Sequence, residues 1–176
     1  MPISKFKCIP VLAAGSAVIA VPNTAAAQSL DETISYIVEK CDGAEELMSN
    51  PRFSRTQAIK TTSFRIDMSG DVRTTTQMRS YETADRSNVR SNPPIVISFS
   101  VSEVKFEVSP FDKDQLETKL VGLVVVKAKG GANAPVSPVV TNGKPGNSNG
   151  FYCRNPDRVV KAFNHLNTLV KPDPFK

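Results

Sequence analysis

The sequence predicts an α+β fold, with an antiparallel β-sheet or small barrel of about six or seven strands flanked by an N-terminal and a C-terminal helix. Apolar residues recur with helical spacing near both ends of the chain, over 29–41 and 156–170. Most of the residues between these segments alternate between apolar and polar, with the period of a strand. Helices that precede and follow a run of strands are typical of α+β folds.

The first predicted helix lies in the stretch SLDETISYIVEKCDG and begins with a capping box. Ser29 can accept a hydrogen bond from the amide of Glu32, and the Glu32 carboxylate can accept one from the amide of Ser29. Gly43 can end the helix. The following residues, 44–56, are ambiguous and fit a turn with a short helix. One face of the first helix is apolar and contains Leu30, Ile34, Ile37, Val38 and Cys41.

The next segments predict a β-hairpin. SFRIDMS (63–69) and VRTTTQMRSYE (72–82) both alternate, and the turn residues Ser69, Gly70 and Asp71 lie between them. One side is expected to face the core, with Phe64, Ile66, Met68, Val72, Thr74, Thr76 and Met78. The opposite side carries Arg65, Asp67, Arg73, Thr75, Gln77, Arg79 and Tyr81.

Further strands are predicted in the second half of the chain. IVISFSVSEVKFEVS (95–109) fits two short strands or one bent strand, with a change of face near Ser102 and Glu103. LETKLVGLVVVKAK (116–129) predicts another strand, with 123–126 buried on both faces. Residues 130–150 are rich in Gly, Pro, Asn and Ser and predict a long loop that contains a short edge strand at 136–140. FYC (151–153) is expected to be the last strand.

The C-terminal segment predicts a second amphipathic helix. Asn155 is the expected N-cap, Pro156 suits the first helical position, and Asp157 complements the positive end of the helix dipole. Lys171 and Pro172 are expected at its end. The inward stripe is formed by Val159, Phe163, Leu166 and Val170.

Strands followed by this helix resemble the pleckstrin-homology-like barrel, in which a last helix closes one open end. The resemblance covers roughly 60–171 and rests on the order of elements and on the inward stripe of the helix. The tryptophan that is characteristic of that family's helix is missing, because the chain contains no Trp. The resemblance implies a scaffold that binds peptides, proteins or lipid headgroups. An α+β fold with helices packed on one sheet face is the alternative.

Residues 1–27 have the three parts of a secretory signal peptide. Lys5 and Lys7 precede a long uncharged run, which ends in Ala25, Ala26 and Ala27. A transmembrane anchor is the alternative, but the run is shorter than the about 20 apolar residues that a span requires. We therefore expect cleavage after Ala27, a single exported domain over 28–176, no transmembrane segment in the mature chain, and a periplasmic or secreted location.

Removal of this segment changes the charge and the cysteine count. The mature chain keeps 20 of the 22 basic residues and all 17 acidic ones, for a net charge of +3. Such a charge, spread along the chain, does not predict a nucleic-acid partner. Two cysteines remain, Cys41 and Cys153, and in an oxidising compartment they are expected to form a disulfide. Two free thiols are the alternative.

The sequence predicts no catalytic set, no metal site and no cofactor. His165 is the only histidine, and it is interpreted as an exposed or half-buried helix residue. The acids of DKDQLE (112–117) resemble a fragment of a calcium loop, but the turn glycine and the other ligands are missing, so solvated turn charges are expected.

A candidate binding face lies on the polar side of the hairpin. Arg73 and Arg79 share one strand face with Tyr81, and Arg65 occupies the polar side of the facing strand. These side chains suit an anionic ligand, such as a phosphate headgroup or an acidic protein face. The alternative is a solvated strand face. Arg86 and Arg90 follow in the next loop.

These observations favour an exported, non-enzymatic binding domain of the bacterial envelope, with an envelope protein or an anionic ligand as its partner. The alternative is a cell-wall hydrolase that works through carboxylates. That reaction requires two acids that face each other across a cleft, and the sequence does not place such a pair.

Overall fold

The computed structural model describes residues 29–50, 54–109, 120–131 and 137–170, and it confirms the predicted α+β class. The predicted signal peptide, the DKDQLE acids, Lys171 and Pro172 lie outside the described residues. Beyond the seven predicted strands, the structure contains β1, β4 and β9. The elements are α1 Leu30–Cys41, β1 Glu45–Asn50, β2 Arg55–Ile66, β3 Asp71–Glu82, β4 Arg90–Ser91, β5 Ile95–Ser100, the 3₁₀ helix η2 Val101–Glu103, β6 Val104–Val108, β7 Val121–Ala128, β8 Val139–Thr141, β9 Lys144–Gly146, β10 Ser148–Arg154 and α3 Pro156–Leu169.

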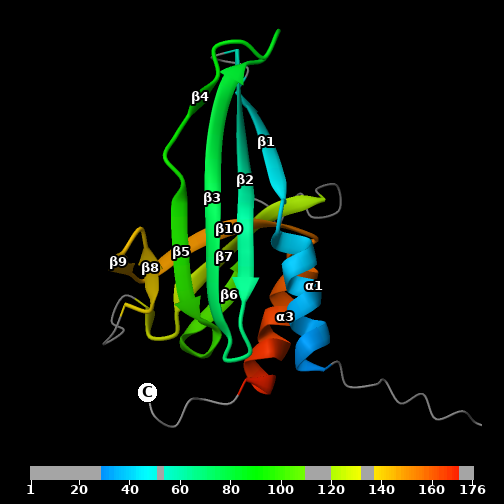
Figure 1. Cartoon of the computed structure of the whole chain (residues 1–176), viewed down its shortest axis with the longest axis vertical. Helices are drawn as coiled ribbons and strands as arrows, with labels where there is room; N and C mark the ends of the chain where they lie inside the picture. Colours follow the sequence, from blue (N-terminus) through cyan, green and yellow to red (C-terminus); the bar gives the residue numbers. More distant parts are fainter. Residues whose placement is uncertain (1–28, 51–53, 110–119, 132–136, 171–176) are drawn as a thin grey trace, which may run out of the picture.

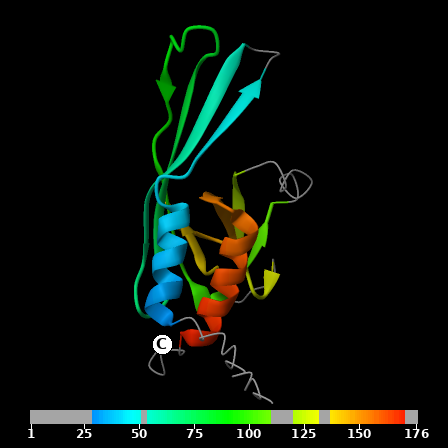
Figure 2. The ribbon, with the colours of Figure 1, turned by 90° about the vertical axis from the view of Figure 1, so that its right-hand side faces the viewer.

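The strands form two antiparallel sheets. The large sheet has the order β1-β2-β3-β5-β8-β9, with β4 paired to β3, and the small sheet has the order β10-β7-β6. The helices α1 and α3 lie side by side; α1 also contacts β2 and β10, and α3 contacts the small sheet (Figure 1). Residues 45–50, 55–60 and 77–82 project beyond the helices as an arm of the large sheet (Figure 2).

The core lies between the two sheets and α3, and it is built around five phenylalanines. The rings of Phe106 and Phe163 stack with their centroids 4.1 Å apart, and the rings of Phe64 and Phe151 approach to 5.0 Å. Phe99 stacks on Phe151 at 6.1 Å. Because these rings come from β2, β5, β6, β10 and α3, the cluster joins both sheets to the C-terminal helix. The change of face predicted near Ser102 is confirmed, since η2 separates β5 from β6.

The capping box and the disulfide fix α1 in the structure as predicted. The Glu32 amide donates to Ser29 Oγ at 3.2 Å, and the Ser29 amide donates to Glu32 Oε2 at 2.9 Å. At the other end of the helix, Cys41 is bonded to Cys153 of β10, and both are fully buried. Arg154 donates from the next position to the carbonyl oxygen of Glu39, at 3.4 Å. The bridge therefore ties the C-terminal end of α1 to the small sheet.

The inward stripe of α3 and the predicted N-cap position of Asn155 are confirmed, but the capping hydrogen bond expected from the Asn155 side chain is not formed. Val159, Phe163 and Leu166 are fully buried, and Pro156 opens the helix. Asn155 occupies the N-cap position with φ 51° and makes no side-chain capping hydrogen bond. It serves instead as the left-handed residue through which the chain leaves β10, a conformation that asparagine tolerates better than most residues.

Two segments expected to be helix or loop are strands. Residues 45–50 form β1, which pairs with β2 along its whole length. Leu47 is 57% exposed and Met48 38% exposed on opposite faces, so the segment lacks a single buried stripe and its pairing decides its structure. Within 130–150, the predicted edge strand is present as β8, and it forms a hairpin with the unpredicted β9 around Asn142 and Gly143, whose φ values of 50° and 78° suit a type I′ turn.

Burial also differs from the prediction at two places. In β7 the burial alternates: Val124 and Val126 are fully buried, whereas Leu123 and Val125 are only half-buried. Only one face of the small sheet is therefore fully buried, and the prediction that 123–126 are buried on both faces is wrong. Met68, expected to point inward, is 58% exposed, because β2 ends at Ile66 and Met68 lies in the turn.

We expect Gly70→Ala to destabilise the protein more than Gly143→Ala. Both glycines have positive φ, at 80° and 78°, so alanine at either site costs about 1–2 kcal/mol of backbone strain. At Gly70 an added Cβ would also lie 3.0 Å from Val170 Cγ2, whereas nothing lies within 4 Å at Gly143. Overpacking adds about 1–3 kcal/mol at Gly70. Equal losses in urea unfolding would contradict the packing of Val170 on this turn.

Candidate anion-binding site

The candidate site lies on the outer face of the large sheet, the face turned away from the phenylalanine cluster. Arg65 of β2 pairs directly with Arg73 of β3, Arg73 pairs with Ser98 of β5, and Ser98 pairs with Val140 of β8. Directly paired residues of antiparallel strands point to the same face. These four residues therefore form one cross-strand row, which we call the arginine row.

Arg65 and Arg73 are both exposed, and neither guanidinium has a hydrogen bond or an ion pair with another described residue. Like charges that lie directly opposite each other across two strands destabilise a sheet. Two guanidinium groups side by side provide up to ten N–H donors for an anion. An external oxyanion can therefore contact both guanidinium groups of the arginine row.

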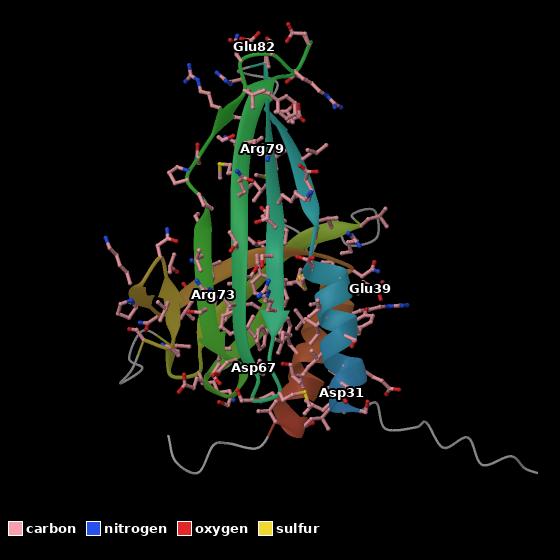
Figure 3. All side chains as sticks on the ribbon, in the orientation of Figure 1. Asp31, Glu39, Asp67, Arg73, Arg79 and Glu82 are labelled. Atoms are coloured by element: carbon pink, nitrogen blue, oxygen red, sulfur yellow. A yellow bond between two sulfur atoms is a disulfide. The ribbon has the colours of Figure 1, made fainter. Side chains whose placement is uncertain are left out.

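The other two predicted residues share this face but lie farther along β3. Arg79 and Tyr81 are six and eight positions from Arg73, and at roughly 3.3 Å per residue the distance from Arg73 to Arg79 is about 20 Å. Figure 3 shows Arg73 beside the body of the protein and Arg79 on the projecting arm. The Arg79 guanidinium donates to Gln77 Oε1 at 3.4 Å. One small ligand therefore cannot contact Arg73 and Arg79 together, although an extended partner can.

A shallow pocket of about 280 Å³ adjoins the arginine row. Its lining includes Ser98 of the row together with Ser100, Asp71 and Glu103. Ser100 Oγ and Ser102 Oγ are hydrogen-bonded at 3.1 Å. This pocket presents hydroxyls and two carboxylates, so an anion on the row is expected to lie on the Arg65 side, away from Asp71.

A second pocket, of about 400 Å³, lies between α1 and α3 and was not predicted from the sequence. Tyr36 of α1 and Arg158, Lys161, Ala162 and His165 of α3 line it. The α3 residues lie three to four positions apart, so they share one helix face. The spacing in the sequence could have identified this polar helix face. It could not have shown that α1 packs against the face, because that packing is a tertiary contact. His165 is half-buried, as expected for a helix histidine.

Lys40 lies beside the lining residue Tyr36, one helical turn further along α1. Lys40 Nζ lies 2.6 Å from Glu39 Oε1 and 5.6 Å from the centre of the Tyr36 ring. The hydrogen bond from Lys40, and then its positive charge, lower the pKa of Glu39. Lys40 is therefore engaged by a carboxylate that stays ionised at neutral pH.

Within the described ranges, no group of three or more His, Cys, Asp or Glu residues is placed to hold a metal ion. In the same part of the chain, no helix has the length and apolar character that a membrane crossing requires. Comparison with known protein families, with curated proteins and with solved structures finds no match to this chain.

Proposed function

We propose that this protein is an exported, non-enzymatic binding domain of the bacterial envelope whose arginine row binds phosphate headgroups at an anionic membrane surface. The observation that carries the proposal is the direct pairing of Arg65 with Arg73, both exposed and without a partner among the described residues. An arrangement that costs stability through charge repulsion is better explained by a bound anion than by folding.

The shape and charge of the large sheet support a surface as the partner. The row lies on one face of the sheet, and Arg79 continues the same face along the arm, so several headgroups can be contacted at once (Figure 3). Guanidinium groups suit phosphate because they donate two parallel hydrogen bonds. A mature net charge of +3 adds a weak attraction to anionic surfaces. The order of strands and last helix, which resembles the pleckstrin-homology-like barrel, is in keeping with a binding scaffold.

The test is co-sedimentation of the purified protein with vesicles that contain phosphatidylglycerol, beside vesicles of phosphatidylcholine alone. We expect binding to the anionic vesicles only. Each basic residue near such a surface contributes about 1 kcal/mol, so the double variant Arg65→Thr/Arg73→Thr is expected to bind about thirtyfold more weakly. Its thermal stability is expected to be unchanged or slightly higher, because the variant removes a like-charge pair.

The matched control is Lys105→Thr/Lys144→Thr. This variant removes two exposed positive charges from strands β6 and β9, outside the arginine row. We expect it to keep most of the binding. Equal losses in the two double variants would show a general charge effect and contradict the proposal. Retention of the protein on an acidic envelope protein, with no retention on the vesicles, would replace the membrane by a protein partner.

The cell-wall hydrolase remains the second candidate, because Asp71 and Glu103 line the same pocket. Two carboxyl groups flanking one pocket are what a glycosidase requires. We expect no digestion of purified cell wall by the wild-type protein. Digestion that is abolished by Asp71→Asn or Glu103→Gln, and not by the arginine-row variant, would make the protein an enzyme.

A further inference from the structure

We propose that the pocket between α1 and α3 is a second, independent binding site, which takes a small ligand that carries a phosphate group. The pocket is bounded by Tyr36, Arg158, Lys161, Ala162 and His165 and has a volume of about 400 Å³. This volume is in the lower part of the range of roughly 300–1,000 Å³ that is typical of small-molecule sites. The site shares no residue with the arginine row.

The pocket offers hydrogen-bond donors that are not used within the described structure. The Arg158 guanidinium and the Tyr36 hydroxyl have no hydrogen bond or ion pair with any described residue. They approach the pocket from different helices, Arg158 from the first turn of α3 and Tyr36 from the middle of α1. A tetrahedral oxyanion, with oxygens in several directions, can accept from both at once.

Two carboxylates close in sequence to the lining residues, Asp157 and Glu39, are already engaged by lysines. Asp157 Oδ2 lies 2.8 Å from Lys161 Nζ, and Glu39 Oε1 lies 2.6 Å from Lys40 Nζ. These ion pairs neutralise Lys161 and Lys40 but leave Arg158 as an uncompensated cation beside Tyr36. A phosphate group that enters the pocket therefore gains the charge of Arg158 and competes with Asp157 for Lys161.

The remaining lining defines the rest of the ligand. The Ala162 methyl group and the Tyr36 ring give the pocket an apolar part, and Lys40 lies over that ring. A phosphate monoester of a small apolar or aromatic alcohol matches both parts, whereas inorganic phosphate fills only the polar part. We therefore expect phenyl phosphate to bind more tightly than inorganic phosphate, and phenol not to bind.

The experiment titrates the full chain, freed of its leader by export, with phenyl phosphate, inorganic phosphate and phenol, and follows backbone amide shifts by NMR. Phenyl phosphate is expected to shift resonances of α1 and α3 with a millimolar or lower dissociation constant. Arg158→Gln should weaken binding about tenfold through loss of a charge-assisted hydrogen bond. Tyr36→Phe, which changes no charge, should weaken it about two- to tenfold.

Two further variants separate a site from a general charge effect. Asp157→Asn removes the competitor for Lys161 and should tighten binding about two- to fivefold. Arg90→Gln removes an exposed charge on β4 and should leave binding unchanged, as should the arginine-row double variant. The proposal is supported if binding of phenyl phosphate is tightened by Asp157→Asn and is unchanged in the other two variants. It is overturned if phenyl phosphate shifts no resonance of α1 and α3, or if Arg90→Gln weakens binding as much as Arg158→Gln.

Discussion

Phe163→Ala is expected to lower the free energy of unfolding by about 3–5 kcal/mol, the cost of truncating a fully buried phenylalanine. Phe163 stacks on Phe106 at 4.1 Å and also contacts the rings of Phe64 and Phe151. Through this side chain, α3 packs into the core between the two sheets. Urea unfolding of the oxidised protein, followed by far-ultraviolet circular dichroism, measures this loss.

The matched control for this prediction is Leu47→Ala on β1. Leu47 is 57% exposed, so its truncation should change stability by less than about 0.5 kcal/mol. A loss below about 1 kcal/mol for Phe163→Ala would be smaller than any cavity-forming phenylalanine truncation is expected to give. Such a result would mean that α3 does not pack into the phenylalanine cluster.

The second large effect is expected from loss of the disulfide. The Cys41–Cys153 bridge closes a loop with a sequence separation of 112 residues. In the chain-entropy account, a loop of this length contributes about 4–5 kcal/mol by restricting the unfolded chain. Cys41→Ala/Cys153→Ala should therefore unfold at markedly lower urea concentration and temperature than the oxidised wild type.

Reduction of the wild-type protein provides the control, because it breaks the bond without changing the side chains. The reduced protein and the double variant should show similar losses, within the small cost of replacing two buried thiols. If both unfold at the same urea concentration as the oxidised protein, the bridge does not form in solution, and the α1 end is held by packing and by Arg154 alone.

Much of the fold could be predicted from the sequence. In both helices, the structure favoured by the local sequence is also the one favoured by burial against the sheets. The capping box at Ser29 and the stripe of Val159, Phe163 and Leu166 each specify a helix locally, and the same residues are buried against the sheets. β1 could not be predicted in this way. Its exposed Leu47 and Met48 show no one-sided burial, and the segment is a strand only because β2 is beside it.

One missed feature did have a local signal. The sequence TNGK contains Asn142 and Gly143, the favoured residues of a two-residue hairpin turn, between the short strands β8 and β9. The abundance of glycine and proline around it favoured the interpretation as a loop. Asn155 takes the predicted N-cap position, but its side chain does not cap the helix, because the residue adopts a left-handed conformation where the chain leaves β10.

The candidate site residues could be predicted only where they lie on one strand or on two strands joined by a short turn. The shared face of Arg73, Arg79 and Tyr81 follows from alternation within β3, and the register of the hairpin then places Arg65 opposite Arg73. The separation of Arg73 from Arg79 also follows from strand geometry. The pocket of Tyr36 and Arg158 could not be predicted, because it exists only where two helices from opposite ends of the chain meet.

The proposed exported, disulfide-linked binding domain requires first that the chain is exported. The most direct test is the intact mass of the protein expressed from its full sequence in a bacterial host, purified from the periplasm or medium without reductant and treated with an alkylating reagent. We predict a chain that starts at Gln28, is lighter than the reduced form by two hydrogen atoms, and is not alkylated. A full-length mass with thiols that become alkylated would contradict export and the bridge, and with them an envelope partner.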